Sequence, residues 1–197
     1  MLAMVIEKLA PPPTGSPVLH FAPEPATLSF LKRKYGEAYT PADFDPSQYP
    51  WVEQPMRQID LARPLEFMPV HSVQGLVHSH VLEHVPGDLT QIVLQMNEAI
   101  EPGGFHIFCV PFFSPWYRED MDPAMTHDDR DRLFGQFDHL RSFGTSDFEQ
   151  RMGPLFKDFE RLRIDQFFTQ EDMARAAVPI RNLTSLTSHS VFFYQKN

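Results

Sequence analysis

Short apolar runs alternate along this chain with segments whose apolar residues recur at the spacing of a helix face. The run Val18–Phe21 follows a Gly-Ser-Pro turn and predicts a buried strand. Pro25 suits the first position of a helix, and apolar residues at helical spacing continue until Gly36. A strand, a tight turn and a helix in this order predict the opening of a βαβ unit.

The alternation continues to residue 110. Asp88 can cap a helix, with Gln91 three residues further on, and the apolar stripe of that helix extends to Ile100, just before Pro102 and two glycines. The run 105–110 is almost wholly apolar, as in a central parallel strand covered on both faces. Further strands are predicted over residues 38–42, 57–59 and 73–79.

The pattern changes after residue 111, because residues 112–144 are rich in aromatic, acidic and histidine residues. We predict a long insertion over the ligand-binding edge of the sheet, with a short helix from Thr126 through Leu133. The chain then closes with a predicted strand near 161–168, a short helix capped by Thr169, and a last strand over 190–195.

Strands that alternate with helices predict a mostly parallel sheet with helices on both faces. We therefore expect an α/β fold, a Rossmann-like three-layer sandwich, in a single domain over residues 1–197 with residues 1–17 as a short N-terminal segment. Ligands of such sheets bind beyond the carboxyl ends of the strands. The candidate residues of this chain lie at those ends or in the insertion.

Composition and charge narrow the class of protein. The net charge of −9 disfavours nucleic acid as a partner, because most of the surface would repel a phosphate backbone. No run approaches the roughly 18 apolar residues of a spanning helix, and the start lacks the pattern of a secretory signal, so we expect a cytoplasmic protein with no membrane partner. The single cysteine, Cys109, lies in an apolar run and predicts a buried structural thiol.

The turn after the first strand contains no glycine and reads His20-Phe21-Ala22-Pro23-Glu24. A nucleotide pyrophosphate needs a glycine-rich turn there so that backbone N–H groups can close on it, which disfavours NAD or ATP. For a ligand without phosphate the turn need not be as open, so a turn with Ala22 could still approach it. Glu24 or a loop carbonyl could then face a cation of the ligand. An ordinary strand-to-helix turn is the structural alternative.

Acidic residues follow the second and third predicted strands. Asp43 lies where a carboxylate can accept both hydroxyls of a ribose, and Asp45 is a possible substitute. Asp60 and Leu61 are placed to meet the amino group and the ring face of a base. An Asx-turn at the first site and a helix cap at the second are the structural alternatives.

Histidines cluster around the end of the fourth predicted strand. His78, His80 and His84 have a spacing that could bring three imidazoles together for zinc. His78, however, should point to the opposite side of the strand from Ser79. We favour a backbone at Ser79 and His80 that lines a ligand site, with Glu83 and His84 ordering the turn, and we expect no metal.

The insertion offers candidates for proton transfer. Asp138 and His139 are adjacent and could act as an acid–base pair. A solvated acidic loop with aromatic residues packed beneath it is the alternative. Other acid–base candidates are Asp122, His127 and Asp128, and possible apolar walls are Trp116, Tyr117, Phe134 and Phe137.

The order of these motifs resembles the type 11 methyltransferase-domain branch of the class I S-adenosylmethionine-dependent methyltransferases. The most specific marks are His-Val-Leu-Glu-His at 80–84 and Pro-Gly-Gly at 102–104. The likeness covers residues 18–111 and, more loosely, 134–141. The other motifs that carry it are Val18 to Glu24, Asp43-Phe44-Asp45-Pro46, Ile59-Asp60, Leu76 to Pro86, and Met96 to Gly104.

The resemblance implies a seven-stranded sheet with an antiparallel last strand and S-adenosylmethionine as cofactor, with S-adenosylhomocysteine as product. It places the first turn on the methionyl part, Asp43 on the ribose, Asp60 on the adenine, and Ser79 with His80 on the sulfonium side. The implied cofactor-binding residues are His20, Phe21, Ala22, Pro23, Glu24, Asp43, Phe44, Asp60, Leu61, Ser79 and His80.

The chain departs from the family where the family has an acid and three glycines, since it has His20, Ala22, Glu24 and Ala26, and Gln74 replaces a common acid. We expect a methyltransferase for a small-molecule acceptor, with Asp138 and His139 as the catalytic pair. A catalytically silent methyltransferase-like binding module is the alternative, and a metal-dependent hydrolase built on the three histidines is a third. The sequence identifies neither the acceptor nor the oligomeric state.

Overall fold

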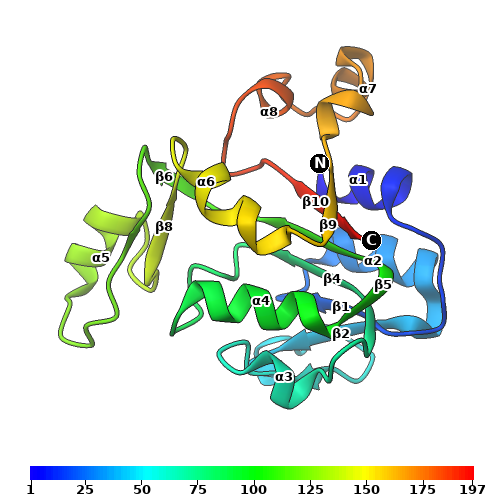
Figure 1. The fold of residues 1–197 in the computed structure, drawn as a ribbon, viewed down its shortest axis with the longest axis horizontal. Helices are drawn as coiled ribbons and strands as arrows, with labels where there is room; N and C mark the ends of the chain where they lie inside the picture. The colour runs from blue at the N-terminus through cyan, green and yellow to red at the C-terminus, as the bar shows by residue number, and fades with distance from the viewer.

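The computed structural model describes residues 1–197, and seven of its strands form one sheet (Figure 1). The strand order is β3-β2-β1-β4-β5-β10-β9. The five strands β3, β2, β1, β4 and β5 pair in parallel, whereas β10 runs antiparallel to both of its neighbours, β5 and β9. This arrangement confirms the predicted sheet. The strands are β1 Val18–Phe21, β2 Tyr39–Asp43, β3 Arg57–Gln58, β4 Val73–Ser79, β5 Ile100–Cys109, β9 Phe159–Leu162 and β10 Phe192–Lys196.

Helices cover both faces of the sheet, so the predicted three-layer sandwich is confirmed (Figure 1). Successive strand residues point into two separate cores: Leu19 and Leu76 pack with α3 and α4, whereas Val18 and Val77 pack with α1 and α2. The helices are α1 Leu2–Leu9, α2 Pro25–Tyr35, α3 Pro64–Phe67, α4 Leu89–Ala99, α5 His127–Phe134, α6 Phe148–Met152, α7 Gln170–Arg175 and α8 Arg181–Thr184, with 3-10 turns at Gly36–Ala38, Pro46–Gln48, Gly153–Phe156 and Ile164–Gln166.

The residues predicted to begin, cap or end helices do so in the structure. Pro25 is the first residue of α2, and Gly36 ends it with a φ of 54°. The Asp88 carboxylate caps α4 by accepting from the backbone N–H of Thr90 and Gln91. Thr169 and Asp172 form a capping box at the start of α7.

The N-terminal segment packs beside the sheet. Helix α1 contacts α2, and Gln74 ties down the residues that follow by accepting from the Thr14 N–H (3.1 Å) and donating to the Pro12 carbonyl (2.6 Å). The position where the family that the sequence resembles often has an acid is therefore occupied by a buried structural amide.

The insertion has more regular structure than predicted. Besides the expected helix, α5, it contains strands β6 (Phe112–Ser114), β7 (Arg118–Glu119) and β8 (Arg141–Gly144), which form a separate three-stranded sheet in the order β6-β8-β7. Short strands of this kind carry little periodicity, because two or three residues cannot display an alternation.

Two buried arginines of the insertion hold its neighbouring loops. Arg141 has no exposed surface, and its guanidinium donates to the carbonyls of Leu82 (2.6 Å), Val85 (2.6 Å) and Gly87 (2.8 Å) in the loop between β4 and α4. Arg130 donates in the same way to the carbonyl of His139 (3.0 Å). The insertion and the loop after β4 are therefore one hydrogen-bonded unit.

Two predicted strand boundaries are wrong. The predicted strand 161–168 ends at Leu162, because Phe167 and Phe168 donate back to the Ile164 carbonyl in a helical turn and leave the sheet. Strand β5 begins at Ile100, predicted as helical, because this residue pairs with Val73; the register then shifts around the glycines. At Gly104 a side chain would lie 2.4 Å from the Gln74 carbonyl, so only glycine fits.

The sheet contains a buried chain of polar side chains. Nε2 of His78 lies 2.9 Å from Nε2 of His106, and Nδ1 of His106 lies 2.8 Å from the Asn97 amide oxygen. Burial lowers the pKa of His106 to about 3 and holds the pKa of His78 well below its usual value. Both rings are therefore neutral in the folded protein near pH 7. Cys109 is also buried, as predicted, and burial raises the pKa of its thiol to about 12.

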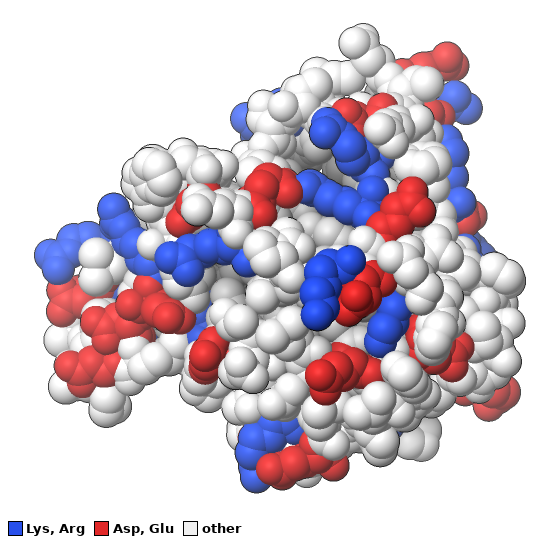
Figure 2. Space-filling view, viewed as in Figure 1, with Lys and Arg blue, Asp and Glu red and all other residues white.

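The charged side chains are unevenly distributed over the face shown in Figure 2. Acidic side chains gather low on the left of that view with basic side chains directly above them, and elsewhere acidic and basic side chains are interspersed. None of the helices has both the length and the apolar character that crossing a membrane requires.

Replacing Arg141 should destabilise the fold strongly. Arg141→Ala would leave the buried carbonyls of Leu82 and Val85 and the partly buried carbonyl of Gly87 without this donor, so we expect the free energy of unfolding to fall by about 3 kcal/mol or more. Urea denaturation measures this loss. Arg132, whose side chain is 74% exposed in the same insertion, is the matched control, and Arg132→Ala should cost under about 0.5 kcal/mol. Equal losses in the two variants would contradict the structural role of Arg141.

The buried histidines should make the fold sensitive to acid. In the unfolded chain both titrate near 6.5, so below that pH the unfolded state binds more protons and stability decreases as the pH falls toward about 3. Between pH 7.5 and 5.5 we expect a loss of about 2.7 kcal/mol in urea denaturation, about 1.4 kcal/mol from each histidine. The control His189→Gln, at an exposed position, should leave this dependence unchanged. Stability that does not change over the interval would argue against a buried neutral pair.

Candidate functional site

A cavity of about 650 Å³ opens at the carboxyl ends of β1, β2, β3 and β4. This is the edge where parallel α/β sheets bind ligands. Seven of the residues predicted to bind a cofactor line this cavity, and so does Asp138 of the insertion. The fold thus brings together residues that are more than a hundred positions apart in the sequence. The predicted residues on its wall are Phe21, Ala22, Asp43, Phe44, Asp60, Leu61 and His80.

The Asp43 carboxylate is held at the end of β2 by two donors. One oxygen accepts from the backbone N–H of Asp45 (2.9 Å), and the other accepts from the hydroxyl of Tyr49 (2.9 Å). Burial and this contact with Asp43 raise the pKa of Tyr49, so it stays protonated and donates. Phe44, whose surface is 66% exposed, lies on the wall next to this carboxylate. An oriented acid beside an accessible aromatic ring suits a ligand with hydroxyl groups and a flat ring.

Asp45, the predicted substitute for Asp43, has a different role. Its carboxylate accepts from the Ser47 N–H and caps the 3-10 turn Pro46–Gln48, and it does not line the cavity. The alternative interpretation as an Asx-turn is therefore correct for both acids, because each accepts from the N–H two residues further on, but Asp43 also lines the cavity.

Asp60 lies at the cavity end of β3. One of its oxygens accepts from the Ala62 N–H (2.9 Å), and the other lies 3.2 Å from the Arg63 guanidinium. The side chain is thus fixed in orientation. Ile59, Leu61 and Ala62 add apolar surface beside it.

The first turn keeps a tight shape without glycine. Ala22 has a φ of 48°, in the left-handed region that costs a residue with a side chain about 1–2 kcal/mol. His80, which follows the neighbouring strand β4, has a φ of 54°. Strained backbone of this kind persists where the surroundings determine it, and it is often found at functional sites.

Four predicted cofactor residues do not line the cavity: His20, Pro23, Glu24 and Ser79. His20 is completely buried, with Nδ1 3.2 Å from the Tyr39 hydroxyl and Nε2 3.4 Å from the Glu24 carboxylate. Burial lowers the pKa of His20, although Glu24 opposes the shift. His20 therefore supports the first turn from beneath.

The insertion end of the cavity contains ionisable side chains. Nδ1 of His84 lies 3.4 Å from the Asp138 carboxylate. Asp138 therefore pairs with His84, whereas the sequence analysis had paired it with His139. His139 is buried behind His84, with the two ring centres 4.8 Å apart. Glu83, next to both, raises the pKa of His80, more than offsetting the effect of burial. This end of the cavity can therefore exchange protons.

The three-histidine zinc site considered from the sequence does not form. His78 points into the sheet core and contacts His106, away from His80 and His84. The aromatic residues expected to wall the site also lie elsewhere, since Phe134 is buried and Trp116 and Phe137 are exposed outside the cavity.

Several residues of the site were not identified from the sequence. Tyr49 and Gln48 belong to the cavity wall, and Arg141 supports it from behind. Tyr49 follows the acid motif within one turn, which is a usable local signal. Arg141 offers none, because its partners lie more than fifty residues earlier in the chain.

No protein-family model matches the sequence, and no curated protein matches it, but solved structures resemble its fold. An S-adenosylmethionine-dependent methyltransferase from Mesorhizobium loti has a TM-score of 0.58 at 14% identity, over 98% of this chain and 96% of that one. A SAM-dependent methyltransferase from Archaeoglobus fulgidus has a TM-score of 0.58 at 14% identity, over 100% and 91%.

A third solved structure adds ligands to the comparison. The geranyl diphosphate C-methyltransferase from Streptomyces coelicolor A3(2), in complex with Mg²⁺, geranyl diphosphate and S-adenosyl-L-homocysteine, has a TM-score of 0.61 at 7% identity, over 100% of this chain and 76% of that one. Identities this low establish the architecture alone. With its strand order and its antiparallel β10, the chain has the fold of the class I S-adenosylmethionine-dependent methyltransferases.

Proposed function

We propose that this protein is an S-adenosylmethionine-dependent methyltransferase that acts on a small-molecule acceptor. The observation that carries the proposal is the convergence of Asp43 and Asp60, from neighbouring strand ends, on one cavity. The names of the similar structures support it, because they are methyltransferases and one was solved with S-adenosylhomocysteine and a small-molecule ligand.

The residues present fit this cofactor. The cavity, at about 650 Å³, lies within the usual range of roughly 300–1,000 Å³ for small-molecule sites. Phe44 offers a ring face for the adenine, and Asp43 offers oriented acceptors for the ribose. Ala22 keeps the left-handed backbone that a glycine would adopt.

S-adenosylmethionine supplies, when bound, a methyl group already activated by its sulfonium. The chain therefore mainly has to bind and align. Asp43 accepts from hydroxyl groups, Asp60 accepts from an amino group, and Leu61 and Val81 exclude water from the faces of the ligand.

Asp138 is the group that we propose takes up the proton from a hydroxyl or amine acceptor, since it is the carboxylate that the insertion contributes to the cavity wall. His84 orients it from 3.4 Å. His139 is a positioning residue, because it is buried and its ring packs edge-on against His84. This arrangement retains both residues of the sequence-based pair but gives them different roles.

Binding of S-adenosylhomocysteine tests the proposal directly. Ligand at about a hundred times its dissociation constant should stabilise the native state by about 2.7 kcal/mol, which raises the melting temperature by roughly 5–10 °C. Asp43→Asn should abolish most of this shift. Asp45→Asn is the matched control, because asparagine preserves the cap and the position lies off the cavity. Equal shifts in the two variants would contradict the ribose role of Asp43.

A silent methyltransferase-like binding module is the second candidate. The glycine-free first turn favours it, because the Glu24 side chain already contacts His20 within that turn. Calorimetry decides between the two candidates: no heat with millimolar S-adenosylhomocysteine, in protein that melts cooperatively, would favour the silent module.

A further inference from the structure

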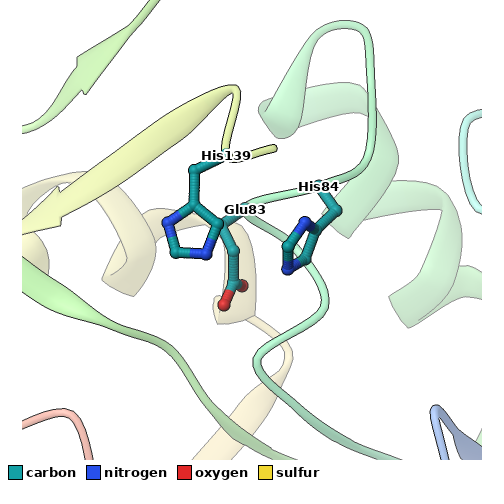
Figure 3. Close-up of side chains that lie close together, drawn as sticks. All are labelled: Glu83, His84 and His139. Carbon is teal, nitrogen blue, oxygen red and sulfur yellow. The ribbon is translucent and has the colours of Figure 1, made fainter. Parts of the chain in front are cut away.

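We infer that Glu83, His84 and His139 form a binding site for a single divalent transition-metal ion, with Zn²⁺ as the best match. One ligand atom from each residue lies within 4.8 Å of the others. Figure 3 shows the Glu83 carboxylate between the two imidazole rings, with His139 approaching from the segment before β8. The site differs from the three-histidine set considered from the sequence and replaces the expectation that no metal binds.

Glu83 is the strongest sign of a missing cation. Its side chain has no exposed surface, and neither carboxylate oxygen has a hydrogen-bond partner. Placing an ionised carboxylate in such surroundings costs several kcal/mol unless a cation or donors compensate it. Nδ1 of His80 lies 3.4 Å from one oxygen, and the guanidinium of nearby Arg141 is already occupied by loop carbonyls. Apart from this one 3.4 Å contact with His80, the buried carboxylate has no partner.

The two imidazoles are arranged as metal ligands usually are. Nδ1 of His139 lies 3.1 Å from the Phe134 carbonyl, which can only accept, so Nδ1 carries the proton and Nε2 keeps its lone pair. Nδ1 of His84 lies 3.4 Å from the Asp138 carboxylate, which favours the same tautomer. Ligating histidines commonly donate their outer N–H to a carbonyl or a carboxylate in this way.

The donor set selects the metal. Two imidazole nitrogens and one carboxylate oxygen suit Zn²⁺ and neighbouring transition metals better than Mg²⁺ or Ca²⁺, which prefer oxygen ligands. Zinc takes these ligands at about 2.0–2.2 Å in tetrahedral geometry, so the ligand atoms must draw together by about 1 Å. His84 is half-buried and can make that movement. Three protein ligands leave the fourth position open.

The site borders the proposed cofactor cavity, since His84 and Asp138 belong to both. Arg141 and Arg130 fix the two segments that supply the ligands: Arg141 bonds the Leu82 and Val85 carbonyls, and Arg130 bonds the carbonyl of His139. Such preorganisation reduces the conformational cost of binding. The inference does not depend on the proposed function, because it concerns binding of the metal alone.

The experiment titrates the full chain, stripped of metal by a chelator, with Zn²⁺ in a calorimeter and with Co²⁺ as a spectroscopic probe. We expect one equivalent of either ion and a visible Co²⁺ absorption band of four- or five-coordinate geometry. Neither titration contains S-adenosylhomocysteine, and the cofactor titration is run with chelator present. Failure of the metal site and failure of the proposed function are therefore distinguishable.

Variants assign the ligands. His84→Ala and Glu83→Gln should each weaken Zn²⁺ binding by about 100-fold or more, and Asp138→Asn, which removes only the outer partner of His84, by about 10- to 100-fold. His127→Ala, at an exposed position of the same insertion, should leave affinity within about twofold. His84 is half-buried, so its substitution should leave the metal-free melting curve intact even if Glu83→Gln unfolds the chain.

Two results would overturn the inference. One is the absence of stoichiometric Zn²⁺ binding by the folded wild-type chain, which would mean that the buried Glu83 side chain needs no cation. The other is wild-type affinity in His84→Ala, which would move the bound ion to a surface histidine.

Discussion

Arg141 is a permanent positive charge without exposed surface, and the ligand-binding edge of the sheet is organised around it. A guanidinium cannot lose its proton, so burying it requires acceptors on several sides. The loop after β4 provides them by turning three carbonyls inward. That inward turn places Glu83 and His84 between the main sheet and the insertion. The geometry of the insertion end of the cavity thus follows from the hydrogen bonds that the buried Arg141 side chain requires.

The main sheet could be predicted from the sequence because its signals are local. Val18–Phe21, the cap at Asp88 and the apolar run after Gly104 each determine a strand or helix from a few neighbouring residues, and their alternation determines a parallel sheet. The errors occurred where long-range pairing prevailed. Ile100 has the spacing of the preceding helix but pairs with Val73, and Ile164 was assigned to a strand that the chain leaves at Leu162.

The candidate site could be predicted only in part for the same reason. Asp43, Phe44, Asp60 and Leu61 lie on the cavity because strand ends in parallel sheets meet at one edge. The direction of a side chain within a turn is not encoded locally. Asp45 was a possible substitute for Asp43, and Glu24 was a candidate to face a cation, yet neither lines the wall. The pairing of His84 with Asp138 depends on how the insertion folds back, which no local pattern encodes.

The small sheet β6-β8-β7 has a consequence for how this protein can change. In many enzymes the loops that select substrates vary independently of the scaffold beneath them. Here the insertion supplies the donors that the loop after β4 requires, so trimming it would remove part of the scaffold itself. Evolution or engineering toward a new acceptor must therefore retain Arg141 and β8 and work through exposed positions such as those around Asp138.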